Sequence, residues 1–215
     1  MPVKVIVFDW DGTLVDSEAH IVSCLTFAAA QQNLPQLGYD RYKNIIGLGM
    51  REALLALYPD LDEHQLAAMR EAYSAHFTRS TQNETQLFIG VRDTLEALTR
   101  KGIRLAVATG KSRRGLERAK QETKLGHYFE QERCADETKS KPNPLMLQEL
   151  QHYFDVAFDE MLMVGDTSFD MEMAYNAGMP SVGVSYGVHD PKTFMQWQPH
   201  AIVDNLSDLL TLSQL

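Results

Sequence analysis

Residues 3–16 read V-K-V-I-V-F-D-W-D-G-T-L-V-D, and this stretch decides how the chain begins to fold. Apolar side chains run as far as Phe8, and Asp9 and Asp11 then follow one residue apart, with Gly12 directly behind them. Two neighbouring carboxylates repel each other, and burial would raise the pKa of at least one of them. The stretch is therefore either a strand-to-turn junction with exposed aspartates or part of a site that holds a cation.

Other short apolar runs occur further along the chain, and each ends in polar residues. They cover residues 103–108, 161–164 and 181–184, with a weaker run at 128–134. Because they are apolar on both faces, these runs are typical of buried strands in a parallel sheet. Helical patterns alternate with them, at residues 91–98, 112–124, 145–154, 168–177 and 206–212. The alternation predicts an α/β fold with a doubly wound, Rossmann-like parallel sheet.

The segment from residue 17 to residue 85 interrupts this alternation. It contains Ala- and Leu-rich helical patterns and no convincing strand, and polar residues stand at both of its ends, at 16–18 and 80–85. Two polar linkers that cross at one place are the usual attachment of a movable cap. We therefore expect a core formed by residues 1–16 and 86–215 and an inserted α-helical cap domain formed by residues 17–85.

The charge and composition of the chain argue against nucleic acid and membranes as partners. The chain has 215 residues, of which 44% are hydrophobic, and a formal net charge of -9, so the sequence indicates no basic surface for nucleic acid. No stretch approaches the ~18 apolar residues of a membrane span. Cys24 and Cys134 are too far apart for a disulfide framework, which favours a reducing, cytoplasmic location. The sequence carries no signal for an oligomeric state.

Polar residues at the predicted strand ends indicate one site. Ligands of an open parallel sheet bind beyond the carboxyl ends of its strands, where Asp9, Asp11 and Asp166 all fall. Three aspartates suit a hard divalent cation, and Mg²⁺ is the usual one when phosphate is also bound. A cation would keep Asp9 ionised as a nucleophile. The carboxyl of Asp11 could protonate a leaving alkoxide and later deprotonate water.

Further residues have a functional and a structural interpretation. Thr109 and Gly110 precede a helix start, which is either an anion site or a plain strand end. Lys141 stands before Pro142, and it is either solvated or aimed at phosphoryl oxygens. Asp170 lies about one helical turn beyond Asp166, so it either supports the metal from outside the ligand set or stabilises the helix dipole.

Four motifs together resemble those of the haloacid dehalogenase (HAD) superfamily. In chain order they read D-W-D-G-T-L-V-D-S at 9–17, T-G at 109–110, K-P at 141–142 and G-D-T-S-F-D at 165–170. They span the whole predicted α/β core, and the helical insert after the first motif is similar to the C1 cap of subfamily I. The superfamily's dehalogenases and phosphonatases lack an aspartate at the position of Asp11, so the chain looks like the phosphoglycolate-phosphatase type, with β-phosphoglucomutases close by.

The resemblance also implies residue roles. Asp9 would form an aspartyl-phosphate, and Asp11 would be the general acid/base. The phosphoryl group would be bound by Thr109 with Gly110 and by Lys141. Mg²⁺ would be bound by Asp9, the Asp11 backbone carbonyl and Asp166, with Asp170 helping from outside the ligand set.

Substrate choice is expected in the cap, where residues 46–51 read I-G-L-G-M-R at the position of a specificity loop. Arg51 is either a partner for a substrate carboxylate or second phosphate, or a solvated residue at a helix start.

The sequence therefore predicts a Mg²⁺-dependent phosphatase that hydrolyses a small phosphorylated metabolite through an aspartyl-phosphate. One alternative is a phosphosugar mutase that returns the phosphoryl group to its substrate. Another is a non-catalytic, receiver-like phosphate sensor, which would also need an aspartate cluster with Mg²⁺. Asp11 argues against the sensor, because an acid/base group beside a phospho-aspartate would shorten its life.

Overall fold

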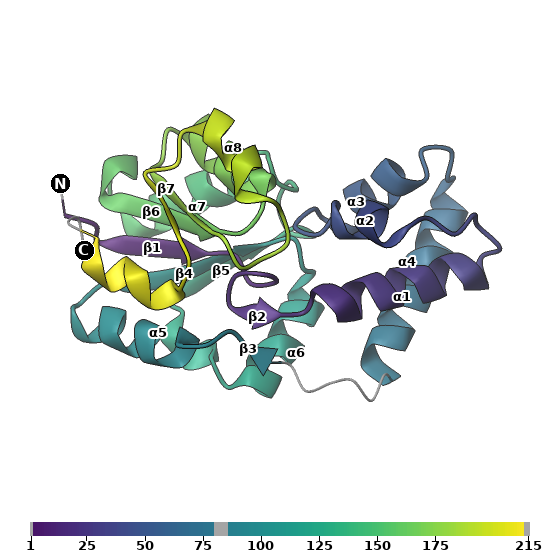
Figure 1. Ribbon diagram of the computed structural model, residues 1–215, viewed down its shortest axis with the longest axis horizontal. Coiled ribbons are helices and arrows are strands. Elements are labelled where there is room, and N and C mark those ends of the chain that lie inside the picture. Colours follow the sequence, from purple (N-terminus) through teal and green to yellow (C-terminus); the bar gives the residue numbers. More distant parts are fainter. Residues whose placement is uncertain (1, 80–85, 213–215) are drawn as a thin grey trace.

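The computed structural model describes residues 2–79 and 86–212, and its centre is a six-stranded parallel sheet with the order β5-β4-β1-β6-β7-β8 (Figure 1). β1 (Val5–Phe8) lies between β4 (Arg104–Thr109) and β6 (Met161–Gly165). The remaining strands are β5 (Gln131–Cys134), β7 (Ser181–Val184) and β8 (Ala201–Val203). The chain passes from β1 outward to β5 and returns to β6 on the other side of β1, so the strand order reverses beside β1. The predicted doubly wound α/β fold is confirmed.

Side chains of β1 alternate between two hydrophobic clusters. Val5 and Val7 pack with residues of α7 and α8, whereas Ile6 and Phe8 pack with residues of α5, α6 and the 3-10 helix η4. The bounds of these helices are α5 (Val91–Arg100), α6 (Arg113–Thr123), α7 (Leu145–Phe154), α8 (Ser168–Ala177) and η4 (Leu206–Thr211). Helices thus cover both faces of the sheet, which explains why the central strands are apolar on both sides.

Local sequence signals explain where several elements begin or end. The structure differs from the prediction mainly at short elements. Ser112 caps α6, its Oγ accepting a hydrogen bond from the backbone N of Gly115 at 3.2 Å. The expected helix at 206–212 is a 3-10 helix, which short segments favour. The weak run before residue 134 is the edge strand β5, which is only partly buried. Elements too short to show a periodicity were not predicted: α2 (Tyr39–Lys43), the 3-10 helices η1 (Gly126–Tyr128), η2 (Phe158–Glu160) and η3 (Pro191–Trp197), and β8.

The helical insert, residues 18–79, lies beyond the carboxyl ends of the central strands (Figure 1). Its helices are α1 (Glu18–Gln31), α2, α3 (Met50–Leu57) and α4 (Glu63–Arg79). They share a hydrophobic cluster that Val188 joins from the sheet side. On either side of the insert, β2 (Val15–Asp16) pairs antiparallel with β3 (Gln86–Leu87), so the chain leaves the sheet and returns to it at one place. The predicted second linker, 80–85, lies outside the described residues.

The cysteines and the helices can be compared with the predictions about disulfides and membrane spans. Cys24 and Cys134 are both buried, and neither forms a disulfide. Across residues 2–79 and 86–212, no helix combines the length and the apolar character that crossing a membrane requires.

Replacing Leu95, which is buried on α5 against the sheet, tests this packing. We expect Leu95→Ala to lower the free energy of unfolding by about 2–5 kcal/mol, because the lost contacts leave a cavity. Glu96→Ala on the exposed side of the same helix is the matched control and should change it by less than about 0.5 kcal/mol. Urea denaturation measures both, and equal effects of the two variants would contradict the assigned helix face.

Candidate active site

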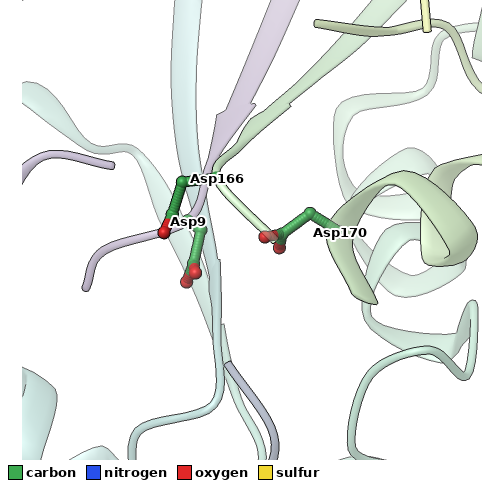
Figure 2. A group of neighbouring side chains, drawn as sticks. All are labelled: Asp9, Asp166 and Asp170. Carbon is green, nitrogen blue, oxygen red and sulfur yellow. The ribbon is translucent and has the colours of Figure 1, made fainter. Parts of the chain in front are cut away.

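Three buried aspartates converge where the strand order reverses. Asp9 follows β1, Asp166 follows β6, and Asp170 lies in the first turn of α8. Each offers a carboxylate oxygen within 4.8 Å of the others. Figure 2 shows Asp9 and Asp166 side by side, with Asp170 reaching toward them from its helix. The structure therefore brings together residues that are up to 161 positions apart in the sequence, from Asp9 to Asp170.

Residues that follow Asp11 hold the Asp166 carboxylate in place, together with Val188. Thr13 Oγ1 donates to Asp166 Oδ1 at 2.7 Å, and the backbone N of Val188 donates to Oδ2 at 2.8 Å. Gly12 has a φ of +79°, and a Cβ at this position would overlap the Asp166 carboxylate. Gly12 and Thr13 of the first motif thus serve Asp166: Gly12 leaves space for its carboxylate, and Thr13 donates a hydrogen bond to it.

Lys141 joins two of the aspartates. Its Nζ lies 2.8 Å from Asp9 Oδ1 and 2.6 Å from Asp170 Oδ1, and all three side chains are buried. The other oxygen of Asp170 accepts hydrogen bonds from the backbone N and the Oγ1 of Thr167, at 3.1 and 2.7 Å. Asp170 therefore closes a capping box at the start of α8 while it also binds Lys141, and its support of a metal stays a prediction.

Burial dominates the electrostatics of the cluster. It raises the pKa of Asp9 from 3.8 to about 7, although Lys141 acts in the opposite direction. Burial and the charges of Asp9 and Asp170 likewise raise the pKa of Asp166. Burial alone would lower the pKa of Lys141, but the carboxylates of Asp170 and Asp9 outweigh it and raise that pKa. Lys141 thus pairs with two of the three carboxylates, and ionising all three would leave an excess of negative charge.

The donor set fits a hard divalent cation. The ligand atoms are carboxylate oxygens, which such cations prefer. Both oxygens of Asp9 are buried; Oδ1 contacts Lys141 Nζ, and Oδ2 has no hydrogen-bond partner within the described residues. Buried polar atoms normally have such a partner, so Asp9 has free lone pairs for a ligand.

The carboxyl group of Asp11 lies apart from this cluster and has its own partners. Ser17 Oγ donates to Asp11 Oδ1 at 2.6 Å, and Lys111 Nζ lies 2.8 Å from Asp11 Oδ2. The sequence analysis did not identify Ser17 and Lys111 as site residues. Ser17 ends the first motif and Lys111 directly follows the second. The sequence does not show that both lie next to Asp11 in space.

The second motif contacts the helical insert. Thr109 is buried at the end of β4, and its Oγ1 accepts a hydrogen bond from the backbone N of Lys111 at 3.2 Å. A Cβ on Gly110 would come within 2.6 Å of the Gly47 carbonyl oxygen and 2.5 Å of that of Leu48. The loop at 46–51 therefore rests directly on the backbone of Gly110, which only a glycine permits.

Arg51 is not brought to the aspartates. Its guanidinium forms two hydrogen bonds with the carboxylate of Glu63 on α4, at 2.6 and 2.7 Å, and half of its side chain is exposed. Its contacts are those of the solvated alternative, and substrate binding by Arg51 stays a prediction.

Comparison with known proteins places this geometry in context. Residues 6–184 match the model of a family described as haloacid dehalogenase-like hydrolase. The phosphoglycolate phosphatase of Vibrio parahaemolyticus serotype O3:K6 (strain RIMD 2210633) is 30% identical over 216 residues, covering 97% of this chain and 95% of the relative.

Solved structures agree over the same length. A crystal structure from Bacteroides fragilis, described as a haloacid dehalogenase-like hydrolase, is 26% identical with a TM-score of 0.89, covering 96% of this chain and 99% of its own. One from Haemophilus somnus 129pt, described as a predicted phosphoglycolate phosphatase, is 28% identical with a TM-score of 0.86, covering 97% of both chains. The similarity thus includes the sheet and the helical insert.

The raised pKa of Asp9 predicts a pH-dependent stability in EDTA. A carboxyl whose pKa is higher in the folded protein stabilises it at pH values below 3.8 and loses that contribution as the pH rises through about 7. Relative to Asp9→Asn, the wild type should therefore lose roughly 4 kcal/mol of unfolding free energy between pH 4 and pH 8, at about 1.4 kcal/mol for each pKa unit. Urea denaturation across this pH range measures the difference. A difference that does not change with pH would contradict the burial of Asp9.

Proposed function

The chain belongs to the haloacid dehalogenase-like hydrolase family, and we propose that it is a Mg²⁺-dependent phosphatase that hydrolyses a small phosphorylated metabolite through an aspartyl-phosphate. The observation that carries the proposal is Asp9, a buried carboxylate beside Lys141 whose oxygens have free lone pairs. The phosphoglycolate phosphatases among its relatives support this reaction class.

Asp9 would be the nucleophile. Its carboxylate attacks the phosphorus, the bond from phosphorus to the ester oxygen breaks, and the leaving alkoxide takes the proton of Asp11. In the second half, Asp11 accepts a proton from water as that water attacks the aspartyl-phosphate, which releases phosphate and restores Asp9. Lys141 Nζ contacts Asp9 Oδ1, and Thr109 ends β4, the strand that pairs with β1; both side chains would stabilise the phosphoryl oxygens.

The metal would be held by the Asp9 and Asp166 carboxylates and the Asp11 backbone carbonyl. When bound, Mg²⁺ would neutralise the charge of the carboxylates and of the phosphoryl group. Asp170 would act from outside the ligand set, because its oxygens bind Lys141 and Thr167 and so fix the position of that ammonium group.

Residues 17–85 would form a cap domain on a core of residues 1–16 and 86–215. The separate hydrophobic cluster of the insert and the β2–β3 pair at its base support this division. Closure of such a cap keeps bulk water from a phospho-enzyme. Two buried cysteines without a disulfide support a cytoplasmic location.

Activity of Asp9→Asn tests the nucleophile. We expect hydrolysis of p-nitrophenyl phosphate to fall by at least about 1,000-fold in this variant, because the amide cannot form the acyl-phosphate. Asp93→Asn, which changes an exposed aspartate on α5, is the matched control and should retain wild-type turnover.

Metal removal and product analysis complete the test. EDTA should abolish wild-type turnover, and added Mg²⁺ should restore it. Activity that survives in Asp9→Asn would rule out the mechanism. Isomerised sugar phosphate without release of free phosphate would favour the mutase alternative.

A further inference from the structure

Lys111 lies at the boundary between the sheet and the helical insert. It directly follows Thr109 and Gly110, and its side chain is only 12% exposed. The ammonium group is 2.8 Å from Asp11 Oδ2 and 5.3 Å from the centre of the Phe77 ring on α4. It therefore stands between the proposed acid/base group and the insert.

Two other cations that the sequence analysis considered for phosphate or substrate binding have carboxylate partners of their own. Lys141 is buried and paired with both Asp9 and Asp170. Arg51 is bound to Glu63 within the insert. The single carboxylate facing Lys111 is Asp11, as far as the described residues show, and the proposed mechanism requires Asp11 to be protonated and directed at the leaving group.

Further groups surround the Phe77 ring. Arg118 on α6 donates to the Phe77 carbonyl oxygen at 3.3 Å, and its guanidinium, which is paired with Glu122, is 5.4 Å from the ring centre. His20 on α1 stacks on the ring, with 4.2 Å between the ring centres. Burial lowers the pKa of His20, and the charges of Lys111 and Arg118 lower it further, which favours the neutral imidazole.

An unpartnered polar atom lies at the same place. His20 Nε2 is buried and has no hydrogen-bond partner among the described residues. Buried ring nitrogens normally have a partner, so a further polar group fits here. The Lys111 ammonium group and the His20 ring both contact Phe77, so the two groups lie close together at this boundary.

We propose that Lys111 is a specificity-determining residue that binds a carboxylate of the substrate, so that the substrate class is small phosphorylated carboxylic acids. The inference rests on the proposed phosphatase function. The substrate carboxylate takes the place of the Asp11 carboxyl at Lys111 Nζ, and Asp11 is then free to turn toward the ester oxygen. A neutral substrate tail cannot replace Asp11 in this ion pair.

Substrate pairs that differ only in the carboxylate test the inference. In the wild type, kcat/KM should be higher for 2-phosphoglycolate than for ethyl phosphate, which has the same two-carbon chain without the charge. In Lys111→Met the ratio of the two values should fall by about 10- to 100-fold, mainly through the KM for 2-phosphoglycolate, since a buried charge-assisted hydrogen bond is lost. Lys111→Arg should recover part of the ratio.

Lys139→Met is the matched control, because it removes the same charge from an exposed side chain nearby and should leave the ratio unchanged. Equal kcat/KM for both substrates in the wild type would overturn the inference without any variant, so it does not depend on the folding of Lys111→Met. An unchanged ratio in a folded Lys111→Met would overturn it as well. Both results would leave the phosphatase function standing, whereas a wild type inactive on p-nitrophenyl phosphate with Mg²⁺ would overturn the function itself.

Discussion

The ion pairs of the Lys141 ammonium group with Asp9 and Asp170 are the contacts on which the rest of the site depends. All three groups are buried, where an unpaired charge is far more costly than in water. Lys141 pairs with two of the three aspartates, and burial still raises the pKa of Asp9 and of Asp166. The carboxylates that would destabilise an ordinary core are the oxygen ligands that the proposed metal requires.

Much of this arrangement could be predicted from the sequence, because its signals are local. An apolar run that ends in an aspartate reports a strand and its carboxyl end, and parallel strands bring such ends to one edge. Asp9, Asp166 and Lys141 therefore came together as expected. Asp170 was assigned two alternative roles; one of its oxygens caps α8, and the other binds Lys141, a contact that was not predicted.

The partners of Asp11 could not be predicted from such local signals. Ser17 is six residues away and Lys111 follows a different strand, so neither a period nor a motif links them to this carboxyl. Arg51 also has a partner that was not predicted, and its role in substrate binding stays a prediction. A helix start with two glycines before it indicated an accessible cation, but Glu63, twelve residues later on the next helix, binds its guanidinium. Pairings made by tertiary packing of the insert have no sequence signature at this distance.

The hydrogen bonds that hold Asp166 have a consequence for the synthesis of the protein. Thr13 and Gly12 leave the ribosome early, whereas the carboxylate that they hold follows 153 residues after Thr13 and its last hydrogen bond comes from Val188. A nascent chain that already displays the complete first motif thus has no aspartate cluster until nearly the whole core has been synthesised. The aspartate cluster is therefore complete only late in translation, and premature termination before α8 yields a polypeptide that carries the proposed nucleophile without its site.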